Sequence, residues 1–272
     1  MPTRDQKYDA FVQLHKRPGI FVIPNPWDAG SAKILTALGF EALATTSAGY
    51  AFSAGLHDVN TELTREKILE NAKAIVEATH LPASADMQDG FGRSPEHCAE
   101  TIRLAAEAGL AGGSIEDFTG DPADPIYDFN LTVERIAASA EAAKKHRFLL
   151  TARAENYLHG RPDLNDTIRR LQAFDKAGAD VVYAPGMTKL DDIRHVCASV
   201  SKPVNVVMGL KGTPFSVDEL AEAGVKRVSV GGSLARAALG ALVRAAREIK
   251  DHGKFTYAAD AISNADANRF MG

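Results

Sequence analysis

The stretch AEAGLAGGSIED, residues 106–117, joins the end of a helix-like segment to a short apolar run. A glycine just past a helix adopts the left-handed conformation that ends the helix, and the run 110–116 is typical of a buried parallel strand. The same join recurs at Leu38-Gly39, Ala177-Gly178 and Ala223-Gly224. This repeat is half of a β–α–β unit, so it predicts an α/β protein with a parallel sheet.

Working outward from this join, the chain contains eight candidate strands with helical patterns between them. The expected strands are 19–24, 42–47, 82–88, 111–117, 148–155, 180–185, 203–208 and 227–231. Eight units in 272 residues match the size of a (β/α)8 TIM barrel, and an open sheet of fewer strands is the alternative. No Pro/Ser-rich linker interrupts the alternation, so we expect one domain over residues 1–272.

Two further helical patterns, 234–250 and 257–268, follow the eighth strand. A barrel does not need all of this chain. We therefore expect a C-terminal helical extension, at about 253–272, that covers the barrel end or packs on a neighbouring subunit.

Composition favours a small-molecule enzyme in the cytoplasm. The net charge of -4 and the lack of a basic run give no reason to expect nucleic acid. No apolar run approaches the roughly 18 residues that span a bilayer, so no membrane partner is expected, and residues 1–7 show no apolar signal segment. Two isolated cysteines, Cys98 and Cys197, are expected to be free thiols.

Charged side chains end three successive expected strands: Asp86, Glu116 and Arg153. In a TIM barrel the functional residues lie at these carboxyl ends. Neighbouring strands lie about 4.8 Å apart, so the two carboxylates would repel unless a cation lay between them. Oxygen ligands without nearby His or Cys favour Mg2+, with Mn2+ possible, and Arg153 suits a substrate carboxylate or a developing oxyanion. A purely structural ion-pair network is the alternative.

Two glycine-containing segments are weaker candidates for binding anions. Gly49, in the segment Ser47-Ala48-Gly49 after the second strand, lets the backbone approach a ligand, although the segment also fits a plain turn. Gly231-Gly232-Ser233, before a helix, is similar to a phosphate-binding join, with close packing as the alternative.

Three ordered motifs resemble the isocitrate lyase / phosphoenolpyruvate mutase superfamily, and the resemblance covers nearly the whole chain. The motifs are residues 85–92 (ADMQDGFG), 113–117 (GSIED) and 152–155 (ARAE), flanked by Pro24-Asn25-Pro26-Trp27-Asp28-Ala29 and Pro203-Val204-Asn205. The resemblance implies a Mg2+-dependent homotetramer, a dimer of dimers, in which a C-terminal helix is exchanged between neighbouring barrels.

The resemblance also implies roles for single residues. Asp86 matches a metal ligand, and Glu116 and Asp58 match acids that help to hold the hydrated metal and take part in catalysis. Ser47, Ala48 and Gly49 match the turn that holds the substrate carboxylate. Arg153 matches the arginine that stabilises an enolate oxygen or carboxylate. Asn205, in the seventh-strand motif, is a further expected substrate-binding residue.

The sequence departs from the family pattern at two places. Gln88 stands where the family has a second metal-site acid, which would weaken the metal site or shift this role to Asp89. The Lys-Lys-Cys-Gly-His loop of the lyases is replaced by residues 118–127 (FTGDPADPIY), which contain no Cys, Lys or His. The gating loop of the mutases is not recognisable either. True isocitrate lyase and phosphonate-forming mutase activities are therefore not expected.

The combination of Mg2+ and Arg153 predicts a carbon–carbon lyase that acts on an α-oxo or α-hydroxy carboxylic acid through a stabilised enolate. An oxaloacetate-decarboxylase-like reaction needs no acid/base cysteine. Retro-aldol cleavage would need a base, for which Glu155, Tyr50 and Tyr127 are candidates. The alternatives are a paralogue that binds 2-oxo acids without turnover, a phosphonopyruvate or PEP-type P–C bond enzyme, and a phosphate-binding barrel built around Gly231–Ser233.

Overall fold

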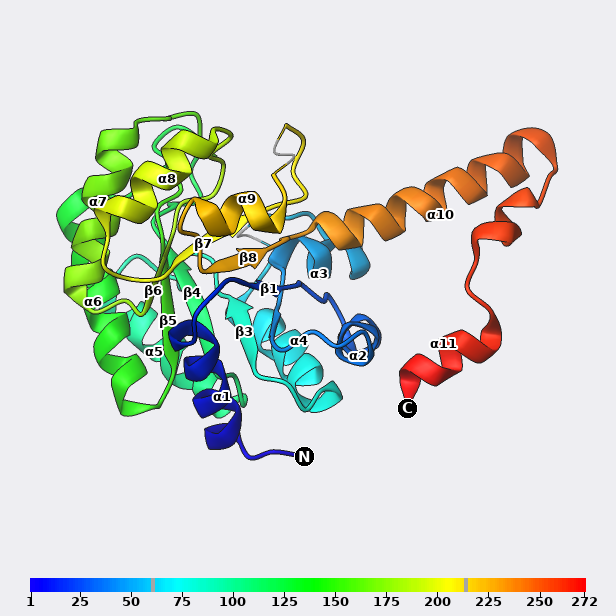
Figure 1. Cartoon of the computed structure of the whole chain (residues 1–272), viewed down its shortest axis with the longest axis horizontal. Helices are drawn as coiled ribbons and strands as arrows, with labels where there is room; N and C mark the ends of the chain where they lie inside the picture. The colour runs from blue at the N-terminus through cyan, green and yellow to red at the C-terminus, as the bar shows by residue number, and fades with distance from the viewer. Residues whose placement is uncertain (60–61, 213–214) are drawn as a thin grey trace.

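The computed structural model describes residues 1–59, 62–212 and 215–272. Eight parallel strands form one sheet in the order β1-β8-β7-β6-β5-β4-β3-β2. The amide of Ala44 in β2 donates to the carbonyl of Pro24, just after β1, at 3.0 Å. This bond links the two ends of the sheet, so the sheet is a nearly closed barrel with helices around it (Figure 1). The (β/α)8 prediction is confirmed.

All eight expected strands are present, each shorter than its apolar run. They are β1 (Phe21–Ile23), β2 (Leu43–Ala44), β3 (Ala83–Asp86), β4 (Gly112–Glu116), β5 (Leu149–Arg153), β6 (Val181–Tyr183), β7 (Val204–Val207) and β8 (Arg227–Ser229). The second strand shows why they are short. Thr46 already caps a helix, so the chain leaves the sheet two residues after Ala44.

The helices between the strands pack against the outside of the barrel. They are α2 (Ala29–Ala37), α3 (Ser47–Ser53), α4 (Arg65–Ala78), α5 (Pro95–Glu107), α6 (Phe129–Lys145), α7 (Leu164–Ala177), α8 (Leu190–Ser199) and α9 (Val217–Glu222). The glycines of the four repeated joins have φ values between 88° and 106°, so the predicted left-handed helix ends are present. None of the helices in the described part of the chain is both long enough and apolar enough to cross a membrane.

One helix, α1 (Arg4–Lys16), precedes the barrel and closes its amino-terminal end. It begins at Thr3, which forms a capping box with Gln6. Phe11 is fully buried in a cluster with Phe21, Leu149 and Val181, which lie at or near the starts of three strands. The cavity described below is therefore closed at this end and opens at the other.

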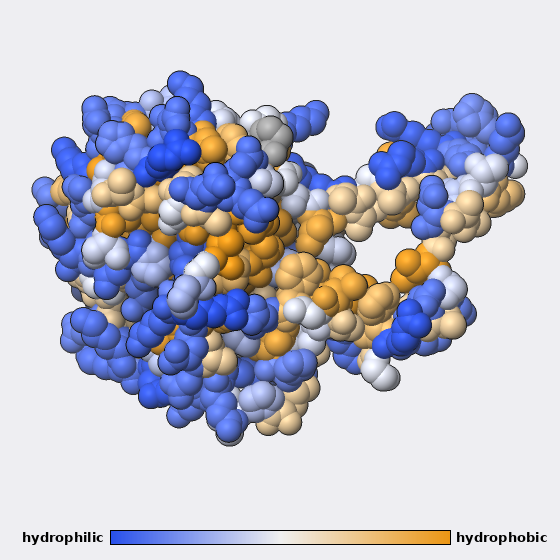
Figure 2. Space-filling view, in the orientation of Figure 1, coloured by the Kyte–Doolittle hydropathy of each residue, from blue (hydrophilic) through white to orange (hydrophobic). Residues whose placement is uncertain are grey.

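The C-terminal segment forms an arm outside the barrel. α10 (Ser233–His252) projects away, the 3-10 helix η1 (Thr256–Asp260) turns the chain, and α11 (Asn264–Met271) returns beside α2 (Figure 1). The Lys33 ammonium in α2 donates to the carbonyl of Met271 at 2.6 Å. The predicted helix 234–250 is present as α10, whereas the predicted helix 257–268 is divided into η1 and α11 because the chain leaves the helical conformation between them. Apolar surface is exposed along parts of the arm and on the adjoining barrel (Figure 2).

Candidate active site

The predicted charged residues meet at the carboxyl ends of β3, β4 and β5. The strand register places Asp86 beside Ser114, Glu116 beside Arg153, and Arg153 beside Tyr183 on β6. Parallel strands that end at one edge bring residues distant in sequence into one cluster. The expectation that these three charges lie together is confirmed.

Arg153 is the centre of this cluster. Its Nη1 lies 2.9 Å from Asp86 Oδ1, its Nη2 lies 3.2 Å from Glu116 Oε2, and its Nε lies 2.7 Å from Glu155 Oε1. The guanidinium carbon also lies 5.1 Å from the centre of the Tyr183 ring. Burial alone would lower the pKa of Arg153, but Glu155, Glu116 and Asp86 raise it well above its usual range. Arg153 is therefore a permanent cation in a fixed orientation.

The cluster carries an excess of negative charge. Three carboxylates contact the Arg153 guanidinium, and a fourth, Asp58, lines the same cavity. Burial and the charges of Glu155 and Asp86 raise the pKa of Glu116 well above its usual range, although Arg153 opposes this. Desolvation and the charge of Asp86 likewise raise the pKa of Asp58. A cation that bound here would relieve this repulsion.

The donor set fits a hydrated magnesium ion better than a closed metal cage. Asp86 and Asp58 both line the cavity, and their charges interact. Mg2+ typically keeps several waters and takes one or two direct carboxylates. In the described parts of the chain, however, no three His, Cys, Asp or Glu side chains are arranged as a ready metal cage.

Gln88 and Asp89 lie away from this cavity. Gln88 has a φ of 47°, and its buried Oε1 has no hydrogen-bond partner among the described residues. Asp89 accepts a hydrogen bond from the Tyr127 hydroxyl at 3.1 Å and lines a separate cavity with Tyr127 and Arg93. Gln88 as a metal ligand stays a prediction, and the position of Asp89 does not favour a shift of this role to it.

Residues 47–49 form the first turn of helix α3 instead of an isolated turn. The Thr46 hydroxyl accepts from the Gly49 amide at 3.2 Å, and Ser47 Oγ donates to Asp86 Oδ2 at 2.9 Å. A Cβ on Gly49 would lie 2.6 Å from Thr46 Cγ2 and 3.0 Å from Trp27 Cβ, so close packing requires glycine there. Ser47 and Ala48 line the cavity. Substrate binding by residues 47–49 stays a prediction.

The amides before Gly232 are already engaged. The Val230 and Gly231 amides donate to Asn25 Oδ1 at 2.8 and 3.0 Å, and Asn25 Nδ2 donates to the carbonyl of Thr45. Asn25 thereby joins the ends of β8, β1 and β2. This arrangement supports close packing over phosphate binding at Gly231–Ser233.

The cavity of about 340 Å³ extends below the charged cluster into the barrel. TIM-barrel interiors are usually filled by layers of bulky side chains. The inward-facing residues below the mouth are instead small or polar: Ser84, Ser114, Thr151, Asn205 and Ser229. Asn205 donates to Ser229 Oγ at 3.0 Å and accepts from Arg227 Nε at 2.8 Å.

Among the residues that line this cavity, Tyr183, Arg227 and Arg236 are polar or charged side chains that the sequence analysis did not predict as site residues. Arg227 had a detectable signal, because an arginine inside an otherwise buried parallel strand departs from the usual apolar run. Arg236, exposed on the first turn of α10, and Tyr183 gave no comparable signal.

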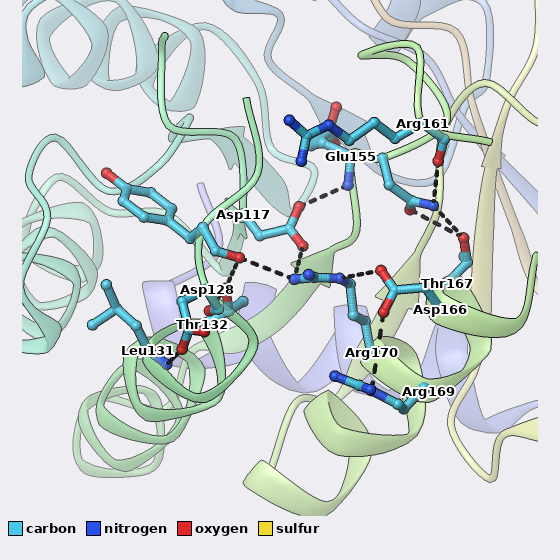
Figure 3. Close-up of polar contacts among 12 residues, drawn as sticks. Asp117, Asp128, Leu131, Thr132, Glu155, Arg161, Asp166, Thr167, Arg169 and Arg170 are labelled. Carbon is cyan, nitrogen blue, oxygen red and sulfur yellow. Dashed lines mark hydrogen bonds and ion pairs between the residues drawn. The ribbon is translucent and has the colours of Figure 1, made fainter. Parts of the chain in front are cut away.

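A buried network next to the cavity holds Glu155 in position (Figure 3). Asp117, which follows β4, accepts from the Glu155 amide at 2.8 Å and pairs with Arg170 at 3.1 Å. Arg170 also donates to Asp166 at 2.8 Å. Burial raises the pKa of Asp117 to about 7, although the Glu155 amide and Arg170 lower it. Because Glu155 contacts Arg153, this network also supports the orientation of Arg153.

The fold and the cluster together define a (β/α)8 barrel with an acidic, arginine-centred site at its mouth. The family model "Phosphoenolpyruvate phosphomutase" matches residues 11–250. The chain therefore belongs to this family, within the isocitrate lyase / phosphoenolpyruvate mutase superfamily. The resemblance inferred from the three motifs is confirmed.

Individual relatives agree with this assignment. A 2-methylisocitrate lyase of Halalkalibacterium halodurans is 30% identical over 249 residues, which cover 90% of this chain and 82% of that protein. The structure of a "putative lyase/mutase" from Burkholderia cenocepacia J2315 is 57% identical, with a TM-score of 0.96 over 99% of this chain and 96% of that chain. The structure of a 2,3-dimethylmalate lyase is 25% identical, with a TM-score of 0.85 over 100% of this chain and 95% of that chain.

Proposed function

We propose that this protein is a Mg2+-dependent lyase that cleaves a carbon–carbon bond in an α-oxo or α-hydroxy carboxylic acid. The observation that carries the proposal is the position of Arg153, which pairs with Asp86 and Glu116 while it lines a cavity at the strand mouths. This position places a fixed cation beside carboxylates suited to a divalent metal.

Asp86 would hold the metal, with Asp58 and Glu116 acting on its water ligands. Bound Mg2+ supplies Lewis-acid polarisation of the substrate oxygens. The four carboxylates also disfavour an anionic substrate in the absence of a cation, because they would repel it. We therefore expect metal to bind before the substrate.

Arg153 stabilises the negative charge that grows on the keto oxygen when the bond to C3 breaks. In decarboxylation, the electron pair of the C3–carboxylate bond moves to form the C2–C3 double bond of an enolate, and CO2 leaves. A proton then adds to C3. Arg153 is already in place for the enolate oxygen, so it favours the transition state over the ground state. Tyr183 lines the cavity with a protonated hydroxyl and is a candidate proton donor to C3, although burial raises its pKa and makes it a weaker acid.

Decarboxylation is favoured over retro-aldol cleavage by the positions of the three candidate bases. Tyr127 bonds to Asp89 beside a different cavity, and Glu155 is buried and paired with Arg153. Tyr127, Glu155 and Tyr50 are all absent from the residues that line the main cavity. Decarboxylation needs no base to remove a hydroxyl proton, so an oxaloacetate-decarboxylase-like reaction is the leading specific proposal.

Retro-aldol cleavage of a substituted malate remains the second candidate. The relatives named above as 2-methylisocitrate and 2,3-dimethylmalate lyases favour it. A P–C bond enzyme and a non-catalytic 2-oxo-acid-binding protein are the remaining alternatives.

The test is a metal-controlled substrate panel. Purified protein with Mg2+, and again with EDTA, is mixed with oxaloacetate, 2-methylisocitrate, 2,3-dimethylmalate and phosphonopyruvate, and product release is followed. We expect turnover that requires Mg2+ and is lost in Asp86→Asn. If no compound turns over but 2-oxo acids raise the melting temperature, the protein is a binding protein and the lyase proposal fails.

We also propose a homotetramer in which the C-terminal arm packs on a neighbouring barrel. Leu242, Val243 and Ile262 in the arm are exposed apolar residues. Figure 2 shows open space between the arm and the barrel. Large apolar side chains around such a space favour a partner segment within it.

A further inference from the structure

The floor of the cavity contains a buried cation that the mechanism above does not use. Arg227, the first residue of β8, is only 5% exposed and lines the cavity. Its Nε donates to Asn205 at 2.8 Å, its Nη2 donates to Thr151 at 3.0 Å, and its Nη1 lies 3.3 Å from His15 Nε2. None of these three partners carries a negative charge.

The state of His15 follows from its two neighbours. His15 Nδ1 lies 2.8 Å from the carbonyl of Phe11, which only accepts, so Nδ1 carries the proton. Nε2 is then the free acceptor that faces Arg227. Burial and the charge of Arg227 lower the pKa of His15 to about 3, so the ring is neutral near pH 7.

Arg227 therefore has no negative partner in the described parts of the chain. This distinguishes it from Arg153, which pairs with three carboxylates. Burial lowers the pKa of Arg227 to about 10, with only Tyr183 acting in the opposite direction. A buried charge without a counter-charge lowers the free energy of unfolding, so a functional role is the usual reason for such a residue. After these contacts one N–H remains on each terminal nitrogen, and a carboxylate can accept from both.

The position of Arg227 suits the far end of a substrate. Its partner Thr151 lies two residues before Arg153 on β5, roughly 6.6 Å lower along the strand, so Arg227 contacts β5 about one layer of the barrel below Arg153. The layer between them is lined by small side chains such as Ser84 and Ser114, which leave room for a short carbon chain.

We propose that Arg227 is the binding site for a second carboxylate, so the substrate is a dicarboxylic oxo or hydroxy acid held between the mouth and the floor of the barrel. This inference rests on the proposed function for the chemistry at the mouth.

The test measures binding without turnover. Succinate and butyrate, equal in length but with two carboxylates and one, are titrated by calorimetry in saturating Mg2+ into wild type, Arg227→Met and Arg227→Lys, so that one carboxylate is held at the mouth and only succinate has a second one for Arg227. We expect wild type to bind succinate about 10- to 100-fold more tightly than butyrate. Arg227→Met should lose this preference, and Arg227→Lys should keep part of it. Arg103→Met, on the outer face of α5, is the matched control and should bind as wild type does.

The ligand-free melting temperature separates binding from a structural role. Removal of an uncompensated buried charge should leave the melting temperature of Arg227→Met unchanged or higher. A lower melting temperature with an intact succinate preference would overturn the proposal, as would equal binding of succinate and butyrate by wild type. If Arg227→Met does not fold, Arg227→Lys is used in its place. A weaker preference for succinate in Arg227→Lys would support the proposal, and an unchanged preference would contradict it. Failure of the lyase proposal would show separately, as absence of turnover in the metal-controlled panel.

Discussion

The guanidinium of Arg153 lies 2.9 Å from the carboxylate of Asp86, so the expected enolate-stabilising cation and the expected metal ligand contact each other directly. A metal bound to Asp86 would share this carboxylate with Arg153. Binding of the metal and orientation of Arg153 should therefore be coupled, and changes at either residue should affect both.

Asp86→Asn should weaken Mg2+ binding by at least about tenfold, because it removes one of the few direct carboxylates that Mg2+ uses. Isothermal titration with Mg2+ measures this change. Asp89→Asn is the control, since Asp89 lines a separate cavity and should leave Mg2+ affinity unchanged. Loss of Mg2+ binding in the Asp89 variant, with binding kept in the Asp86 variant, would place the metal elsewhere.

Arg153→Lys should lower kcat by about 100- to 1,000-fold on the substrate found in the panel, which is the usual effect of removing one oxyanion donor. Lysine keeps the charge but not the planar fork that contacts Asp86, Glu116 and Glu155. Steady-state kinetics with melting curves separate lost catalysis from lost folding. A kcat within a few-fold of wild type would show that Arg153 is only structural.

Arg170→Met should destabilise the protein by about 3–5 kcal/mol at pH 8, because it leaves the buried Asp117 without its cation. The loss should be smaller at pH 5. The pKa of Asp117 is about 7 in the folded protein, so the carboxyl is mostly protonated at pH 5 and needs no partner there. Urea unfolding at the two pH values measures the difference. The double variant Asp117→Asn/Arg170→Met is the control and should recover stability at pH 8. An equal loss at both pH values would contradict this explanation.

The free energy of unfolding should decrease in acid because of His15. Its pKa is about 3 in the folded protein against an ordinary value of 6.5. Between these values the unfolded chain takes up a proton that the folded chain does not, so stability falls as pH falls, by at most about 1.4 kcal/mol per pH unit from this group. Above pH 6.5 the group contributes no slope.

His15→Gln removes this titration while keeping an acceptor for Arg227. The free energy of unfolding of this variant, measured with urea at several pH values between 4 and 6.5, should change less with pH than that of wild type. Comparing the two proteins cancels the opposite contribution of Asp117, whose raised pKa makes stability fall as pH rises towards 7. Identical slopes would show that His15 is accessible to protons in the folded state.

Leu242→Glu should reduce the proposed tetramer to smaller species, because Leu242 is 63% exposed in the single chain and would be covered in the assembly. Light scattering after gel filtration measures the mass. Arg244→Glu is the control, since a rotation of 100° per residue places it on the opposite side of α10. A monomeric wild-type protein, or equal masses for both variants, would contradict the exchange of the arm between subunits.

Local patterns in the sequence determined the barrel, the helix ends and the charged cluster. Each depends on neighbours in the chain: Gly109 ends a helix wherever that helix lies, and an apolar run that ends in Asp86 or Arg153 predicts a charge at a strand end. Because parallel strands share one carboxyl edge, the predicted strands alone were enough to predict that Asp86, Glu116 and Arg153 lie close together.

Only the tertiary structure decided which contacts these residues make. The separation of Asp89 from the cavity, the neutral state of His15 and the absence of a counter-charge near Arg227 in the described residues depend on side chains from distant parts of the chain. Burial and partner choice are set by the packing of many elements at once. The sequence therefore determined where the reactive end of the barrel lies, and the packing decided which charges within it are paired and which remain available for a ligand.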